Sequence, residues 1–156
     1  MNAAQIPAQI NVTTPVGPMV VKEIDGQIVS IRWGETRVEQ DTPVLAAAAQ
    51  QLNAYFYCGL REFDLKLAPA GSEFEQAVWQ EMLRIPFGAT KTYGEIARAV
   101  GGMPQAVGGA CGSNPIPIVI PCHRVLAGGG RIGGYSGRGG AETKTFLLTL
   151  EGALLV

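Results

Sequence analysis

Residues 114–125 have the sequence NPIPIVIPCHRV, in which three prolines interrupt a run of branched apolar residues. Proline has no backbone N–H and restricts the residue before it, so this stretch cannot form a helix. We predict an extended, strand-like path through the interior that delivers Cys122, His123 and Arg124 to a defined place. His123 is the only histidine of the chain.

The segment before this stretch predicts a helix-turn-helix. Ser72 and Thr92 are each followed three residues later by a glutamate, and this capping box starts a helix. Gly101 ends the second of these helices, and Pro104 suits the first turn of another that continues to Cys111. By itself the outline is a weak signal for DNA binding, because most short helix pairs joined by glycine are packing units.

The segment after it is rich in glycine, since 13 of the 21 glycines lie between residues 101 and 140. Such runs are usually flexible surface loops. Alternatively, the backbone passes close to a flat ligand that side chains would exclude, and Tyr135 and Ser136 project polar groups into the opening. A helix over residues 141–152 closes the chain. We expect three of its side chains to face the core: Phe146, Leu147 and Leu150.

The N-terminal part has the periodicity of both strands and helices. Apolar residues alternate with polar ones next to Asp25-Gly26, which predicts a β-hairpin with a type I′ turn over residues 18–34. An apolar stripe at helical spacing predicts a helix over residues 44–56. Residues 63–67 could form a further short strand.

These elements together predict an α+β fold with two domains. Residues 1–70 would form a small lobe with a β-hairpin or short sheet and a helix. Residues 71–156 would form a mainly helical lobe that holds the helix-turn-helix and a candidate active-site cysteine. The Pro/Gly-containing linker over residues 68–71 separates the two.

The composition excludes several classes of protein. The chain is 47% hydrophobic and 16% charged, which is too apolar for a disordered segment. A net charge of -1 gives no bulk reason to expect a nucleic-acid partner. However, residues 1–100 carry 8 Lys+Arg against 11 Asp+Glu, whereas residues 101–156 carry 4 against 2. This small basic excess lies in the helix-turn-helix lobe and predicts a shallow salt dependence of DNA binding.

The cysteines and the hydropathy indicate the environment of the protein. Cys58, Cys111 and Cys122 are odd in number and show no paired spacing, which fits a reduced, cytoplasmic protein. With one histidine and no Cys-x-x-Cys spacing, we expect no metal site, and we expect no other cofactor. No apolar run approaches the ~18 residues needed to span a bilayer, so we expect no membrane partner.

Cys122 is the candidate nucleophile. A nearby imidazole or cation favours the thiolate, and His123 and Arg124 are adjacent to it, although adjacent side chains often diverge. The alternative is a small buried hydrophobe beside a satisfied core imidazole. Burying a histidine and an arginine carries a desolvation cost that a packing role would not justify. Glu151 is a candidate for orienting the imidazole, or else an exposed carboxylate near the end of the last helix.

The sequence resembles a known family, the O6-alkylguanine-DNA alkyltransferases, also called methylated-DNA–protein-cysteine methyltransferases. Residues 114–125 are similar to the active-site signature of the family, and the resemblance extends over residues 74–152. It includes the following segments: Val78-Trp79, Ile85-Pro86-Phe87-Gly88, Thr92-Tyr93, Ala106-Val107-Gly108, Gly134-Tyr135-Ser136-Gly137, Lys144 and Leu147-Leu148. The resemblance implies single-use repair of alkylated DNA, duplex or single-stranded, by a monomer without a cofactor.

The resemblance also implies a reaction. The damaged base is rotated out of the duplex, because O6 of a stacked guanine cannot be reached in line. The alkyl group of O6-alkylguanine, or of O4-alkylthymine, then moves irreversibly to Cys122. By the family's pattern His123 is a water-mediated base and Glu151 orients it. Asn114 braces the helix-turn-helix against the active-site segment.

The resemblance also implies which residues bind the substrate and the DNA. Tyr93 would contact the phosphate of the target nucleotide, and the carbonyl of Val125 would accept a hydrogen bond from the exocyclic amine. Tyr135 and the backbone of Ser136 would contact the guanine, and Lys144 is a further substrate-binding residue. We expect four residues to contact DNA: Gln105, Ala106, Arg124 and Arg138.

The sequence departs from the family in several places. Gln105 stands where the family usually has the arginine finger that fills the gap left by the flipped base. Glutamine carries no charge and has a shorter reach, so we predict weaker engagement of duplex DNA than of single strands. The loop over residues 137–144 is about two residues longer than usual and adds Arg138. Cys111 replaces a bulky apolar residue near the pocket, which could widen it for larger alkyl groups.

Three other functions remain open on the sequence. A sensor of alkylated bases would keep the fold without transfer, but in such relatives the cysteine is commonly replaced by tryptophan. A cysteine hydrolase could use Cys-His-Glu, and it would need an oxyanion hole and show turnover. A helix-turn-helix regulator would bind DNA with a purely structural cysteine.

Overall fold

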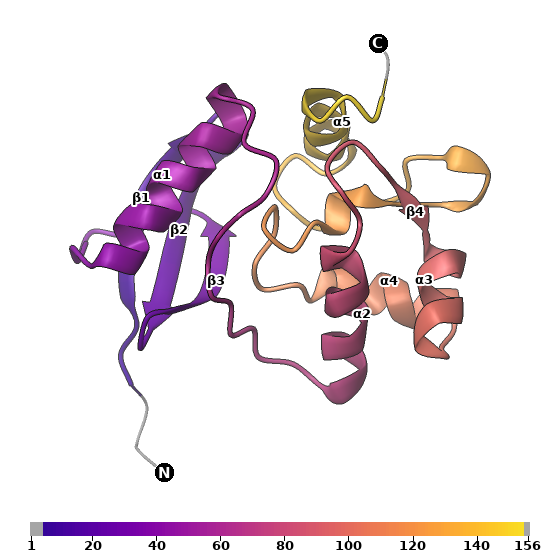
Figure 1. Cartoon of the computed structure of the whole chain (residues 1–156), viewed down its shortest axis with the longest axis horizontal. Coiled ribbons are helices and arrows are strands. Elements are labelled where there is room, and N and C mark those ends of the chain that lie inside the picture. The colour runs from indigo at the N-terminus through magenta and orange to yellow at the C-terminus, as the bar shows by residue number, and fades with distance from the viewer. Residues whose placement is uncertain (1–4, 155–156) are drawn as a thin grey trace. The chain divides into compact units, whose positions relative to one another are not determined.

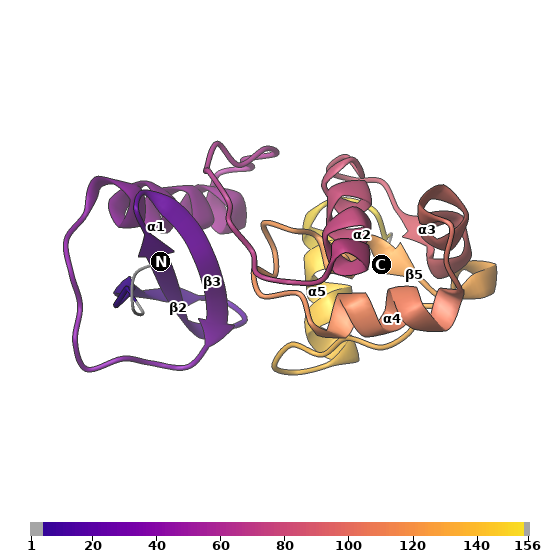
Figure 2. The ribbon, with the colours of Figure 1, turned by 90° about the horizontal axis from the view of Figure 1, so that it is seen from below.

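The computed structural model describes residues 5–154. The chain divides into two compact units, with the boundary between Ala70 and Gly71. Figures 1 and 2 show a sheet with one long helix in the first unit and a group of shorter helices in the second. Within residues 5–154, no helix combines the length and the hydrophobicity needed to cross a bilayer.

The first unit is built on a three-stranded antiparallel sheet in the order β1-β2-β3. Its strands are β1 (Ala8–Thr14), β2 (Gly17–Ile24) and β3 (Gln27–Trp33). The turn between β2 and β3 places Asp25 at φ 53° and Gly26 at φ 81°, and two positive φ values are the requirement of a type I′ turn. The predicted hairpin is therefore confirmed, whereas β1 was not predicted.

One helix packs against this sheet. Helix α1 (Pro43–Tyr57) begins at Thr42, whose hydroxyl accepts a hydrogen bond from the Leu45 backbone, and it contacts β1 and β2 (Figure 1). The helix predicted over residues 44–56 is confirmed. The strand predicted over residues 63–67 is wrong, because this segment pairs with the sheet only at Leu67, opposite Ile28.

The second unit contains four α-helices among its described residues. The elements in chain order are α2 (Glu73–Leu83), β4 (Lys91–Thr92), α3 (Tyr93–Val100), α4 (Pro104–Gly112), the 3-10 turn η1 (Cys122–Arg124), β5 (Val125–Leu126), the 3-10 turn η2 (Gly128–Gly130) and α5 (Ala141–Leu150). Helices α2, α3 and α4 pack against one another (Figure 2). The short parallel pair of β4 and β5 brings the start of α3 beside the residues that follow Cys122.

The helix-turn-helix is formed by α3 and α4. Both predicted capping boxes are present: Ser72 and Glu75 cap α2, and Thr92 and Glu95 cap α3. Gly101 ends α3 in the left-handed conformation, at φ 76°.

The path of residues 114–121 corrects the prediction of an extended strand. The backbone turns sharply here, since Ile118 has φ 76° and the Ile120 N–H donates to the Ile116 carbonyl at 2.9 Å. Prolines prevent a helix but are compatible with tight turns, so their presence did not require extension. All three isoleucines of the segment are buried, so the segment does run through the interior as predicted.

Helix α5 buries only part of the face that was predicted. Leu147 is buried as expected and Leu150 is half-buried, whereas Phe146 is 41% exposed. The other buried side chains of the helix are Thr143, Lys144 and Leu148. The prediction assigned the inward face by hydrophobicity, and it could not foresee that a lysine would be held inside by backbone carbonyls. The helix also ends at Leu150, two residues before the predicted end.

Trp79 links α2 to α4. Its ring is 1% exposed, and its Nε1–H donates to the Ala110 carbonyl at 2.9 Å. This contact ties α4 to α2 one residue before Cys111.

Replacing Trp79 should therefore destabilise the protein. In Trp79→Phe the buried hydrogen bond is lost, and we expect the free energy of unfolding to fall by about 1–3 kcal/mol. Urea denaturation followed by circular dichroism measures this change. Phe146→Ala serves as the control, because this side chain is substantially exposed and its loss should change stability by less than about 0.5 kcal/mol.

Candidate active site

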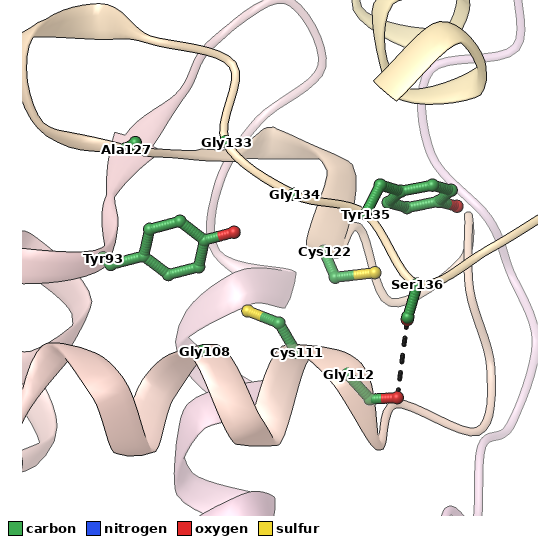
Figure 3. Close-up of a pocket in the computed structure, with 10 residues that line it drawn as sticks. All are labelled: Tyr93, Gly108, Cys111, Gly112, Cys122, Ala127, Gly133, Gly134, Tyr135 and Ser136. Carbon is green, nitrogen blue, oxygen red and sulfur yellow. Dashed lines mark hydrogen bonds between the residues drawn. The ribbon is translucent and has the colours of Figure 1, made fainter. Parts of the chain in front are cut away.

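A pocket of about 480 Å³ opens between α4 and the glycine-rich segment. In Figure 3, α4 runs along one side of the pocket and the backbone from Gly133 to Ser136 runs along the other. The lining residues are Tyr93, Gly108, Cys111, Gly112, Cys122, Ala127, Gly133, Gly134, Tyr135 and Ser136.

Cys122 places its thiol in this pocket. It is the first residue of η1 and is 5% exposed. Burial raises the pKa of the Cys122 thiol, against the opposing effects of a hydrogen bond from Asn114 and the charge of Lys144. The resting group is therefore a neutral thiol, and it needs a base before it can act as a nucleophile.

His123 lies behind the pocket and is fully buried. Its Nε2 is 2.7 Å from Glu151 Oε2, while Nδ1 has no hydrogen-bond partner among residues 5–154. Burial lowers the pKa of His123, although Glu151 acts in the opposite direction. A neutral ring that donates from Nε2 to the carboxylate carries its lone pair on Nδ1, which is the form a general base requires.

Glu151 also holds Arg124. Arg124 Nε donates to Oε1 at 2.8 Å and Nη2 to Oε2 at 3.0 Å, while Nη1 donates to the Ile85 carbonyl at 2.6 Å. Arg124 and Glu151 are both buried, so Glu151 is not the exposed carboxylate that the sequence left open. The prediction that Arg124 contacts DNA is wrong, because its guanidinium is committed to these interior acceptors.

Asn114 closes the turn that precedes Cys122. Its Oδ1 accepts from the Ile116 N–H at 2.9 Å, and its Nδ2 donates to the Ile120 carbonyl at 2.8 Å. One side chain just beyond the end of α4 thus fastens both ends of the loop that leads to the cysteine. This placement agrees with the bracing role expected for Asn114.

Lys144 joins two segments that border the pocket. Its Nζ donates to the Val125 carbonyl at 2.6 Å and to the Gly134 carbonyl at 3.1 Å, and it lies 5.6 Å from the ring centroid of Tyr93. Neither Lys144 nor Val125 lines the pocket. Lys144 thus supports the pocket wall from behind, and the direct substrate contacts expected for Lys144 and Val125 stay predictions.

Tyr93, Tyr135 and Ser136 line the pocket, as the substrate roles assigned to them require. Burial raises the pKa of Tyr93 to about 12 and raises the pKa of Tyr135 still further, so both phenols are neutral. Ser136 Oγ donates to the Gly112 carbonyl at 3.4 Å, a weak bond across the pocket (Figure 3).

Cys111 is a second thiol in the pocket. Burial is the strongest influence on this group and raises the pKa of the Cys111 thiol to about 12, so Cys111 remains a neutral thiol near neutral pH. The sequence placed Cys111 near the pocket, but it did not identify Gly112, Ala127 or Gly133 as lining residues. The high glycine content of this segment could have indicated Gly112 and Gly133 as lining residues, whereas nothing in the sequence pointed to Ala127.

The remaining candidate DNA contacts lie outside the pocket. Gln105 and Ala106 are exposed in the first turn of α4, and Arg138 is exposed in the loop before α5. They stay predictions. Within the described part of the chain there is no group of three or more His, Cys, Asp or Glu side chains that could hold a metal ion.

The pattern of residues around this pocket matches a known family. The sequence model described as "6-O-methylguanine DNA methyltransferase, DNA binding domain" matches residues 73–153. The chain belongs to this family. The resemblance stated from the sequence and the predicted α+β fold are both confirmed.

Individual members of the 6-O-methylguanine DNA methyltransferase family are similar over nearly the whole chain. A methylated-DNA–protein-cysteine methyltransferase of Methanosarcina acetivorans is 40% identical over 90% of this chain and 95% of its own length. One from Mycobacterium tuberculosis is 40% identical over 90% of this chain and 89% of its own.

Solved structures of the family give the same result. The crystal structure of Mycobacterium tuberculosis O6-methylguanine methyltransferase superposes with a TM-score of 0.83 at 37% identity, covering 97% of this chain and 96% of that one. The Mycobacterium tuberculosis OGT in complex with DNA has a TM-score of 0.82 at 40% identity, over 92% and 91% of the two chains.

The buried contacts of Arg124 lead to a prediction about stability. Arg124→Met leaves the Glu151 carboxylate without its bidentate partner, and we expect the free energy of unfolding to fall by about 3–5 kcal/mol. The matched variant Arg138→Met removes an exposed arginine and should leave stability nearly unchanged. Urea denaturation of both variants measures the difference. If Arg124→Met unfolded at the wild-type urea concentration, the structural role of Arg124 would be refuted.

The buried imidazole predicts a pH dependence of stability. The pKa of His123 in the folded protein lies below its ordinary value of 6.5, so just below that pH the unfolded chain binds a proton that the folded protein excludes. Stability is therefore present above pH 6.5 and falls as the pH drops toward the lowered pKa. Urea denaturation at about pH 7.5 and about pH 5.5 should show a larger loss in wild type than in His123→Gln. Equal losses in the two proteins would contradict the assignment.

Proposed function

We propose that this protein repairs DNA by moving an alkyl group from O6 of guanine to Cys122. One observation carries the proposal: the Cys122 thiol faces an open pocket, and His123 next to it is held from behind by Glu151. Its relatives are named methylated-DNA–protein-cysteine methyltransferases, and a DNA complex of a similar structure supports a DNA substrate.

The first step is removal of the thiol proton. His123 is the base, with its Nδ1 lone pair reaching the thiol through a water molecule. The imidazolium that forms is stabilised by Glu151, whose carboxylate is 2.7 Å from Nε2. Arg124 keeps this carboxylate ionised and oriented, while the positive charge of Lys144 favours the thiolate.

The second step is the transfer itself. The thiolate sulfur attacks the alkyl carbon, a carbon–sulfur bond forms, and the bond between that carbon and O6 breaks. The electron pair of the broken bond stays on the guanine, which takes up the proton that left the thiol. The product is a thioether on Cys122 and an intact guanine. Because a thioether is not a leaving group under these conditions, each molecule reacts once.

The pocket suits a flipped purine. A base must leave the stack before its O6 substituent can meet the thiol in line. The pocket volume of about 480 Å³ is in the usual range for a small-molecule site, and Gly108, Gly133 and Gly134 offer flat backbone to an aromatic ring. In this proposal Tyr135 and the backbone of Ser136 bind the guanine, and Tyr93 contacts the phosphate of the flipped nucleotide.

We propose that residues 71–156 act as the DNA-binding and alkyl-acceptor domain and residues 1–70 as a separate α/β lobe. DNA would contact the exposed first turn of α4 through Gln105 and Ala106, and Arg138 would reach the backbone phosphates. Because Gln105 is uncharged, we expect duplex DNA to react more slowly than single strands. The protein would act as a monomer in the cytoplasm, where its three free cysteines stay reduced.

Alkyl transfer to a defined cysteine is the direct test. After incubation with an oligonucleotide that contains O6-methylguanine, the peptide with Cys122 should carry one methyl group, as measured by mass spectrometry of the digested protein. Cys122→Ser should accept none, because a serine hydroxyl is a much weaker nucleophile. Cys111→Ser is the matched control: it removes the other pocket thiol and should still be methylated at Cys122.

The competing functions give other results. An unmodified Cys122 peptide after full incubation would refute the proposal. Repeated turnover on a substrate would point to a cysteine hydrolase, and DNA binding without any alkyl transfer would point to a helix-turn-helix regulator.

A further inference from the structure

Met103 is a large apolar side chain in an unusual place. It is 65% exposed and is the residue immediately before α4, the second helix of the helix-turn-helix. Its side chain makes no capping hydrogen bond, and methionine is a poor residue for this position, where serine, threonine, aspartate or asparagine would stabilise the helix. As a helix cap, this side chain therefore adds nothing to the stability of α4.

The backbone of Met103 is held firmly. Gly101 is in the left-handed conformation and donates its N–H to the Ala97 carbonyl at 2.9 Å. A Cβ atom on Gly102 would lie only 2.6 Å from the ring of Phe74, so the turn packs closely against α2. Pro104 then disfavours helical geometry at Met103, which is extended at φ -103° and ψ 149°. An exposed apolar side chain thus projects from a rigid turn.

The exposed side chains next to Met103 in the first turn of α4 are those of Pro104, Gln105 and Ala106, and Gly108 and Gly109 follow without side chains. Compared with these, Met103 is the longest apolar side chain. The pocket residues Gly108, Cys111 and Gly112 lie further along the same helix. Met103 stands five residues before Gly108 and nine before Gly112, about 8–14 Å along the helix axis, so DNA that places a flipped nucleotide in the pocket passes within reach of this end of α4.

We propose that Met103 is the wedge that enters the base stack when the target nucleotide leaves it. Proteins that distort DNA frequently insert an apolar side chain between base steps, and methionine is among those used. Its unbranched, polarisable side chain adapts to the irregular gap that a rotated base leaves behind. Gln105 is then free to hydrogen-bond the unpaired partner base. This inference rests on the proposed function, since it assigns a residue to the base-flipping step.

Comparing two DNA substrates tests the wedge. The rate of Cys122 methylation is measured with O6-methylguanine in a duplex and in the same oligonucleotide as a single strand. Met103→Ala should slow the reaction on the duplex by about tenfold and change the reaction on the single strand by less than about twofold, because only the duplex must be unstacked. Met103→Leu should retain the duplex rate, since leucine also serves as a wedge.

Two further measurements make the test specific. A 2-aminopurine base next to the lesion should brighten on binding of wild type and Met103→Leu, and much less with Met103→Ala, since its fluorescence reports unstacking. The control variant Phe146→Ala removes another exposed apolar side chain of the same unit and should match wild type on both substrates. Met103→Ala should also unfold at the wild-type urea concentration, because the side chain fills no core space.

The outcomes separate the wedge from the proposed function. Equal duplex rates for wild type and Met103→Ala would overturn the wedge, and so would equal losses on duplex and single strand. In both cases wild-type transfer to Cys122 would still support the proposed function. If wild type left Cys122 unmodified on both substrates, the proposed function would fail and the wedge with it.

Discussion

The second unit depends on the hydrogen bonds that the buried carboxylate of Glu151 accepts. It accepts hydrogen bonds from His123 at 2.7 Å and from Arg124 at 2.8 and 3.0 Å, with all three groups buried. Its negative charge compensates the positive charge of Arg124 and orients the imidazole of His123. Without this carboxylate, the arginine would be an uncompensated charge in an apolar interior. The same contacts fix the end of α5 to the turn that carries Cys122. The site and the fold therefore share their stabilising group.

Around this centre the pocket is shaped by residues that lack side chains. Gly108 and Gly112 form the side of the pocket on α4, and Gly133 and Gly134 form the opposite side. Lys144 keeps the second wall in place by binding the Gly134 carbonyl and the Val125 carbonyl together. Walls without side chains let a planar ligand approach the backbone closely.

The two thiols of the pocket show how position decides reactivity. Burial raises the pKa of both Cys111 and Cys122, so neither is activated by desolvation. The charge of Lys144 partly offsets this effect at both thiols, whereas the hydrogen bond from Asn114 acts on Cys122, which His123 follows in the chain.

In the proposed function, the first turn of α4 faces DNA and carries Gln105 in place of a cation. Contact with DNA there would then depend on shape and hydrogen bonding more than on charge.

The sequence alone determined the local structure and the chemical candidates. Capping boxes, Asp25-Gly26 and the pattern over residues 114–125 act through neighbouring residues, so the helix starts, the hairpin turn and the resemblance to the family could be read directly. Only the tertiary structure decided which groups are buried together. It turned Arg124 inward, placed Lys144 behind the pocket wall and bent the proline-rich segment at Ile118. Each of these outcomes rests on hydrogen bonds between residues far apart in the chain, or on a turn that proline permits but does not dictate, and local sequence patterns do not encode either.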